Sequence, residues 1–324
     1  MAYQTGNAAT IQVLLGKLAD FANGLQWKIK KHTETQLYLS NSREDSHWAI
    51  EFLSNNVYTI PCTHFDLEKS AIAQPGSPCI ENNAYQKVYT RTTELQNGQF
   101  VSYDFFGTSE YLHIVVEIEA ERFRHFGIGN LLKEIEFTGG QYAYSTYMYS
   151  QSEASSNSPL CTYGMGHGYN GTQAVLRADN LGGDTHSPRY FAAMSSYYSE
   201  FKRKQELGFA FYGLGRAAMA NEVNSYHPDK WLVYYSQSKF GQTLIPAPNV
   251  ILGHLLNNTI VRFGTVPDRY ECKMVGIPPK TILEINGERW KIIPSAGFNG
   301  LNQANNTTNP DNTGVQGVAY RLVE

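Results

Sequence analysis

Short runs in which apolar and polar residues alternate recur through the first half of the chain. They follow one another at residues 27–30, 36–39, 47–53, 100–106 and 111–120, with polar turns between several of them. A period of two residues is typical of strands with one buried face, and closely spaced short strands form antiparallel hairpins. We therefore predict a mainly β protein with antiparallel, sandwich-like sheets and a few short helices.

One early segment has helical periodicity instead. Within residues 7–25 apolar side chains recur every three or four positions, Lys17 and Asp20 fall on the opposite side, and Asn23-Gly24 is a typical helix end. The apolar set is Ile11, Leu14, Leu15, Leu18, Phe21 and Leu25. We predict an amphipathic N-terminal helix here and a brief second helix at residues 216–223.

The second half of the chain continues the β pattern. Further apolar runs predict strands at residues 208–212, 231–235, 250–256, 282–285, 290–293 and 318–323. The chain also contains 22 Tyr, 16 Phe and 28 Gly among its 324 residues, a composition that favours strands joined by turns.

A serine-rich stretch at residues 150–158 is the best candidate for a linker. We accordingly predict two regions, an N-terminal helix plus antiparallel β domain at 1–150 and a second β-rich domain at 151–324. The second region contains a long Asn- and Gly-rich loop at 295–314. Its amide side chains suit a polar interface, so we predict a contact with a neighbouring subunit, the alternative being an ordinary surface loop.

Charge and targeting signals exclude several classes of partner. Lys and Arg total 26 against 29 Asp and Glu, giving a formal net charge of -3 that offers no electrostatic footprint for nucleic acid or an anionic membrane. The N-terminal segment lacks a basic region and its apolar residues are interrupted by Lys17 and Asp20. We expect synthesis in a host cytoplasm, no membrane span and no nucleic acid partner.

Motifs for cofactors and metals are weak. Residues 213–218 fit the G-x-G-x-x-A pattern, but the next apolar run ends in Ser236 and Gln237 where a dinucleotide site needs an acidic residue, so a plain turn is the better interpretation. The histidines are scattered, and no cysteine pair has C-x-x-C spacing. The four cysteines are Cys62, Cys79, Cys161 and Cys272. We expect free thiols, no cofactor, no metal and no catalytic residues.

Two groups of side chains leave alternatives open. Glu117 and Glu119 lie two positions apart on one face of an expected strand, which suits either a glycosidase acid and base or, as we favour, the solvated face that also carries Tyr111 and His113. A tyrosine series could form a stacking platform for sugars, a protein contact surface or a sheet face packed on a neighbouring domain. Its members are Tyr142, Tyr144, Tyr147 and Tyr149.

Three further segments carry a resemblance to a known group of proteins. They are residues 111–117 (YLHIVVE), 122–129 (RFRHFGIG) and 138–142 (TGGQY), and they accompany the N-terminal helix, Gly24 with Trp27, and the triplet at 74–76 (QPG). This pattern resembles virion structural proteins of tailed bacteriophages. It covers mostly residues 10–145, with 290–294 and 317–320 near the end, and it includes no catalytic residues.

The resemblance implies a non-enzymatic structural component of a bacteriophage virion, in the tail or baseplate, with a head-neck position as the alternative. The expected partners are other virion proteins and further copies of the chain in a symmetric assembly, with a host-surface glycan as an additional candidate. The runner-up function is a carbohydrate- or receptor-binding module of the tail. A glycoside hydrolase is the least favoured.

Overall fold

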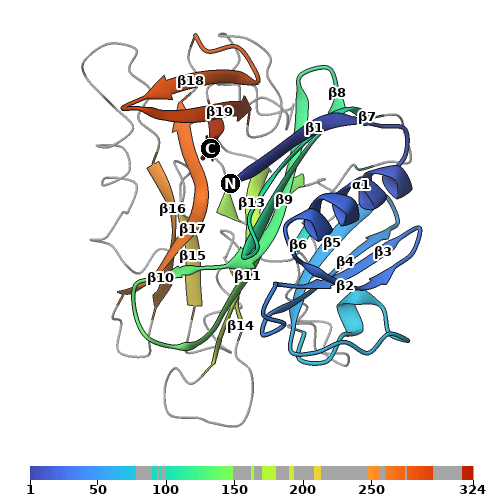
Figure 1. The fold of residues 1–324 in the computed structure, drawn as a ribbon. Helices are drawn as coiled ribbons and strands as arrows, with labels where there is room; N and C mark the ends of the chain where they lie inside the picture. Colours follow the sequence, from blue (N-terminus) through green and yellow to red (C-terminus); the bar gives the residue numbers. More distant parts are fainter. Residues whose placement is uncertain are drawn as a thin grey trace.

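The computed structural model describes residues 1–77, 90–92, 95, 100–148, 162–163, 170–179, 190–192, 208–212, 247–254, 260–273, 276–294 and 316–323. Within these residues the chain forms three antiparallel β-sheets, one α-helix and one short 3-10 helix (Figure 1). The predicted fold class, mainly antiparallel β with few helices, is confirmed.

The largest sheet has eight strands and forms the centre of the molecule. Its strand order is β1-β7-β8-β9-β11-β13-β12, with β14 also paired to β13. The bounds are β1 (Ala2–Ala8), β7 (Phe100–Gly107), β8 (Tyr111–Glu119), β9 (Arg122–Asn130), β11 (Thr138–Met148), β12 (Thr162–Tyr163), β13 (Asn170–Asp179) and β14 (Tyr190–Ala192). We call this the central sheet.

A five-stranded sheet and the helix cover one face of the central sheet. The strands follow chain order, namely β2 (Lys28–His32), β3 (Gln36–Ser40), β4 (His47–Leu53), β5 (Asn56–Cys62) and β6 (Thr90–Thr92), and η1 (Ala71–Ala73) packs beside β4 and β5. Helix α1 (Ile11–Gly24) contacts β7 on one side and β2 and β3 on the other. We call this unit the helical layer.

The predicted N-terminal helix is confirmed, although it begins later than expected. Thr10 caps it, because the Thr10 hydroxyl accepts a hydrogen bond from the Val13 amide. The preceding residues Ala2–Ala8 form β1, a strand that the sequence analysis missed. Its sequence AYQTGNA has no clear apolar alternation, so only its pairing with β7 reveals it.

A seven-stranded sheet covers the opposite face of the central sheet. Its strand order is β15-β16-β17-β20-β19-β18, and β10 pairs with β17. The bounds are β10 (Leu132–Lys133), β15 (Gly208–Tyr212), β16 (Ala247–His254), β17 (Ile260–Lys273), β18 (Thr281–Ile285), β19 (Glu288–Pro294) and β20 (Gln316–Leu322). The structure thus contains strands at five of the six positions predicted in the second half of the chain. We call this unit the outer sheet.

Several sequence predictions fall outside the described residues. They are the strand at 231–235, the brief helix at 216–223, the linker at 150–158 and the loop at 295–314. β11 pairs with β13 along most of its length, so hydrogen bonds of one sheet connect residues on both sides of position 150. The division into two domains itself stays a prediction.

The two covering layers bury both faces of the central strands. On β8, Leu112, Ile114 and Val116 pack with the helical layer, whereas Val115 joins a separate apolar cluster with Val318 of the outer sheet. Alternate side chains of a strand point to opposite faces, so each face of β8 has its own core. Every residue from Tyr111 to Glu117 is buried.

The solvated face that we predicted for β8 is therefore wrong at Tyr111, His113 and Glu117. Their relative exposures are 4%, 0% and 8%. These side chains point toward the outer sheet, and their hydrogen-bond partners there lie more than 150 positions later in the chain. Glu119, at the end of the strand, is exposed as expected.

No helix in the described parts of the chain is both long enough and apolar enough to cross a membrane.

Candidate functional site

Several polar side chains of the segments 111–117, 122–129 and 138–142 meet between the central sheet and the outer sheet. His113, Gly127 and Tyr144 lie side by side on β8, β9 and β11. Because Gly127 has no side chain, the Tyr144 ring lies over it, and a Cβ there would be 2.5 Å from a ring carbon of Tyr144. The Tyr144 hydroxyl thereby reaches Nδ1 of His113, at 2.9 Å.

A second row of paired residues lies two positions away on each of the same three strands. Gly129 is paired with Tyr111 on one side and Tyr142 on the other, and a Cβ on Gly129 would be 2.4 Å from the Cβ of Tyr111. The Tyr111 hydroxyl donates a hydrogen bond to the carboxylate of Asp268 on β17. Asp268 also accepts from Arg321 of β20, with Nε at 2.7 Å.

Two histidines connect the central sheet to the backbone of the outer sheet. Nε2 of His113 lies 2.8 Å from the carbonyl oxygen of Pro267, and Nε2 of His125 lies 2.7 Å from that of Pro294. A carbonyl oxygen only accepts, so each Nε2 carries the proton and donates it. The two Nδ1 atoms then accept, from Tyr144 in the case of His113 and from Tyr320, at 2.8 Å, in the case of His125.

Burial keeps both rings uncharged. Loss of hydration lowers the pKa of His113 to about 3, against the opposing effect of the hydrogen bond to Pro267. Loss of hydration, followed by the positive charge of Arg269, lowers the pKa of His125 to about 3 as well. Both histidines are therefore neutral in the folded protein at neutral pH.

Tyrosines and an arginine fill the space around the two histidines. The guanidinium carbon of Arg269 lies 4.6 Å from the centre of the Tyr144 ring, a cation–π distance. Burial raises the pKa of Tyr142 and of Tyr144 well above the ordinary tyrosine value, and it also raises the pKa of Tyr320. All three side chains therefore keep their protons. We call this set of residues the histidine layer, comprising Tyr111, His113, His125, Tyr142, Tyr144, Asp268, Arg269 and Tyr320.

The histidine layer is arranged to hold two sheets together. A catalytic base needs a ring nitrogen that a substrate can reach. Here both nitrogens of His113 and of His125 are engaged by protein atoms, and both rings have an exposure of 1% or less. The geometry therefore supports a structural role for these histidines.

Of the alternatives left open for the tyrosine series, a platform for sugars or protein contacts does not apply to its first two members. Tyr142 and Tyr144 have no exposed surface and lie between the two sheets. The alternative of a sheet face packed on a neighbouring layer applies to them. The Tyr147 side chain and the whole of Tyr149 lie outside the described residues.

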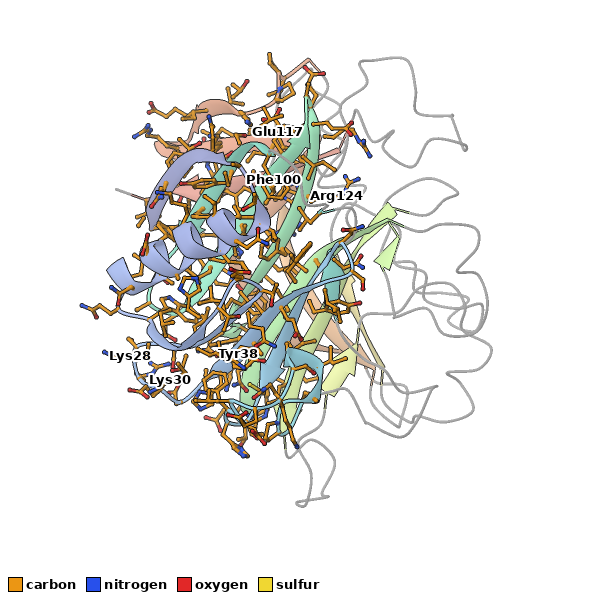
Figure 2. The ribbon with its side chains drawn as sticks, turned by 90° about the vertical axis from the view of Figure 1, so that its right-hand side faces the viewer. Lys28, Lys30, Tyr38, Phe100, Glu117 and Arg124 are labelled. Carbon is orange, nitrogen blue, oxygen red and sulfur yellow. The ribbon has the colours of Figure 1, made fainter. Side chains whose placement is uncertain are left out.

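The glutamate pair predicted as a possible acid and base is separated by its contacts. Glu117 accepts hydrogen bonds from Lys280, from the Ser102 hydroxyl at 2.8 Å and from the Glu121 amide at 3.1 Å. Burial by itself would raise the pKa of Glu117, but these donors outweigh it and lower the pKa. Glu119 instead pairs with Arg122 at 2.6 Å. Figure 2 shows Glu117 near one end of the long central strands.

A glycosidase acid requires a raised pKa so that it holds a proton at working pH. The donors around Glu117 have the opposite effect. The structure thus gives Glu117 a partner in Lys280, which directly precedes β18 of the outer sheet, and the arrangement does not favour the hydrolase alternative.

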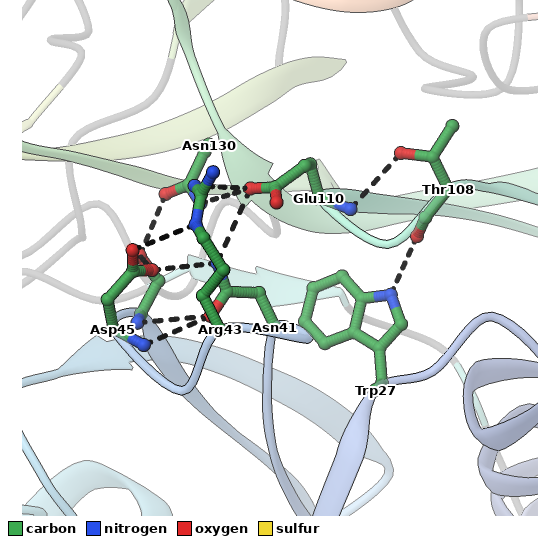
Figure 3. Close-up of polar contacts among 8 residues, drawn as sticks. Trp27, Asn41, Arg43, Asp45, Thr108, Glu110 and Asn130 are labelled. Atoms are coloured by element: carbon green, nitrogen blue, oxygen red, sulfur yellow. Dashed lines mark hydrogen bonds and ion pairs between the residues drawn. The ribbon is translucent and has the colours of Figure 1, made fainter.

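A second polar cluster fastens the helical layer to the turn between β7 and β8 (Figure 3). One carboxylate oxygen of Glu110 accepts from Arg43 at 3.0 Å, Asn130 at 3.0 Å and Asn41 at 3.3 Å. Arg43 also pairs with Asp45 at 3.0 Å. The single positive charge of Arg43 is thus shared between the two carboxylates of this cluster.

Candidate metal ligands do not cluster in the described residues. No group of three or more His, Cys, Asp or Glu side chains that could hold a metal ion occurs there. Within the described residues Cys62 and Cys272 form no disulfide and are buried, and burial raises the pKa of Cys62 to about 12. Cys79 and Cys161 lie outside the described residues, as does the glycine motif at 213–218.

One buried group was missed by the sequence analysis. Lys291 of β19 and Asp104 of β7 form an ion pair between the outer sheet and the central sheet, with side-chain exposures of 8% and 2%. The available signal was weak, because each is a single charged residue within an otherwise apolar or aromatic run.

Comparison of the chain with models of known protein families and with curated proteins finds no match.

Proposed function

We propose that this chain is a non-enzymatic structural subunit of a bacteriophage virion, located in the tail or baseplate and acting through protein–protein contacts. The virion assignment rests on the resemblance of residues 111–117, 122–129 and 138–142 to tailed-phage virion proteins. The observation that carries the structural role is that residues of these same segments pack the central sheet against the outer sheet.

Four distinctive positions of those segments serve packing. Tyr111 and His113 reach the outer sheet. Gly127 provides the space in which the Tyr144 ring lies, and Gly129 allows the close approach of Tyr111 on the neighbouring strand. Glycines in a strand often mark a close approach of neighbouring groups. A sequence pattern that combines such glycines with buried aromatic and histidine side chains therefore maintains a fold. It supports a protein whose function is to be a rigid part of an assembly.

The surface charge is compatible with protein partners. The formal net charge of -3 is small for 324 residues. The exposed lysines of β2, Lys28 and Lys30, lie on an edge strand of the helical layer (Figure 2). Lysines on an edge strand discourage uncontrolled pairing with other strands, which suits a protein that must assemble only at defined contacts.

Proteomics of purified virions of the phage that encodes the chain tests the proposal. We expect the chain in the mature particle at a fixed stoichiometry, and a reconstruction of the particle should contain it in the tail or baseplate. A chain that is expressed during infection but missing from purified virions would rule the proposal out. Binding of the isolated chain to a host glycan would instead favour the receptor-binding alternative.

A further inference from the structure

Lys291, Asp104 and Tyr3 form a closed polar triad between the central sheet and the outer sheet. Nζ of Lys291 lies 2.8 Å from Oδ1 of Asp104. The Tyr3 hydroxyl donates to the same Oδ1 at 2.7 Å and accepts from Nζ of Lys291. The three groups therefore contact one another pairwise.

The triad lies beside an apolar and aromatic cluster. Tyr3 stacks on Phe106 with ring centres 5.0 Å apart, and Phe106 stacks on Tyr320 at 4.4 Å. Ile293 and Val318 of the outer sheet complete that side. Two opposite charges in such surroundings lose much of their hydration, so a reaction that removes both charges is favoured there more than in water.

We propose that Lys291 and Asp104 condense to an intramolecular amide, an isopeptide bond between β19 and β7. Nζ of Lys291 forms a bond to Cγ of Asp104, and the bond from Cγ to Oδ1 breaks. Two protons leave Nζ and depart with Oδ1 as one molecule of water. The balance is one ammonium and one carboxylate giving one secondary amide and one water, so the step needs no oxidant, reductant or activating group.

The contacts supply a path for both protons. The first passes directly from Nζ to the carboxylate that it touches, which leaves an uncharged amine and an uncharged acid. Since Oδ1 is bonded to Cγ, the same contact holds Nζ beside the carbon that it attacks, and reactions of groups held in this way are greatly accelerated. The second proton passes from Nζ to the Tyr3 oxygen while Tyr3 gives its own proton to Oδ1.

Tyr3 is suited to this transfer because it remains protonated. Burial, followed by the adjacent Asp104 carboxylate, raises the pKa of Tyr3 above the ordinary tyrosine value. Its hydroxyl therefore stays available as a donor to the oxygen that leaves.

The amide would connect two sheets through residues 187 positions apart in the chain. It would turn the non-covalent packing of the central sheet on the outer sheet into a covalent link. This inference concerns the chain itself and does not depend on the proposed virion function.

The mass of the purified full-length protein tests the inference. We expect an intact mass, measured after denaturation, that is lower than the sequence mass by one water. Trypsin should then release residues 92–122 joined to residues 290–321, because an acylated Lys291 is no longer a cleavage site. An intact mass equal to the sequence mass, or separate peptides 290–291 and 292–321, would overturn the inference.

Two variants serve as controls. Lys291→Arg keeps a positive charge beside Asp104 but removes the amine, so it should have its full sequence mass. Loss of water that persists in this variant would come from another site and would contradict the assignment. Tyr3→Phe keeps the ring but removes the hydroxyl, and we expect a smaller cross-linked fraction in freshly folded protein. An unchanged fraction would overturn the role given to Tyr3.

Discussion

His113 of the central sheet donates a hydrogen bond of 2.8 Å to the backbone carbonyl of Pro267 in the outer sheet. The bond joins residues 154 positions apart, and it requires that Nε2 carry a proton. Protonation of Nδ1 would repel the proton that Tyr144 donates to it. The hydrogen bond from Tyr144 to His113 therefore depends on this ring being uncharged.

Acid should destabilise the protein through His113 and His125. The folded state holds the pKa of each at about 3, below the ordinary value of 6.5, so below pH 6.5 the unfolded chain binds protons that the folded chain does not. Stability is then fully present above that pH and falls as the pH decreases toward 3, by ~1.4 kcal/mol per pH unit for each histidine. Urea unfolding between pH 4.5 and 7.5 measures this slope.

A matched pair of variants assigns the slope. His125→Gln places an uncharged amide between Pro294 and Tyr320, so the dependence on pH should become shallower. His32→Gln, at an exposed position of β2, should leave it unchanged. Equal slopes in all three proteins would contradict the neutral-histidine account.

Substituting alanine for Gly127 should destabilise the protein. A Cβ at this position would be 2.5 Å from the Tyr144 ring and 2.8 Å from the carbonyl oxygen of Leu112. Neither the backbone nor a fully buried ring can move freely, so we expect a loss of ~1–3 kcal/mol in the free energy of unfolding. Gly24→Ala, where no atom lies within 4 Å of the new Cβ, is the control and should change stability little. Thermal unfolding of the two variants compares them.

The sequence predicts the secondary structure of this region better than the surroundings of its polar side chains. Alternation correctly predicted β8, and helical spacing correctly predicted α1, because both patterns arise from local burial. The polar residues His113 and Glu117 were misassigned to solvent, since their partners Pro267 and Lys280 come from a distant part of the chain. Periodicity reports which side a residue faces and does not report what covers that side.

A clue to the second core was nevertheless present in the sequence. Gly127 and Gly129 alternate within an apolar strand, and glycine in a strand marks the close approach of a neighbouring group. Their partners could not be identified, because the register of β8, β9 and β11 is needed to place Tyr111, His113 and Tyr144 beside them. The pair formed by Asp104 and Lys291 was hidden for the same reason.

Removing the Glu110 carboxylate should weaken the attachment of the helical layer. Glu110→Gln replaces the oxygen that accepts from Arg43, Asn41 and Asn130 with a group that carries its own donors. The Glu110 side chain is 32% exposed, so water compensates in part and we expect a loss of about 1 kcal/mol. The control is Glu34→Gln at an exposed turn position, which should match the parent protein in urea unfolding. A stable Glu110→Gln variant would show that this cluster contributes little.

Glu117→Gln separates the structural account of this residue from the hydrolase alternative. The Glu117 side chain is 10% exposed and holds Lys280, so removing its charge should cost ~1–2 kcal/mol at pH 7. Because the folded state lowers the pKa of Glu117, its contribution is present above the ordinary value of 4.5 and is lost as the pH falls through the folded pKa. The difference between the variant and the parent should therefore shrink in acid.

Glu119→Gln provides the comparison for that variant. The Glu119 side chain is 65% exposed and pairs with Arg122 at the surface, where an ion pair contributes at most ~1 kcal/mol. We expect its unfolding curve to lie close to that of the parent. If the parent protein hydrolysed a glycoside, and both glutamine variants folded normally but lost that activity, the two carboxylates would be acting together on a substrate. That result would contradict the separation of Glu117 and Glu119 into two unrelated ion pairs, and with it the non-enzymatic role proposed for the chain.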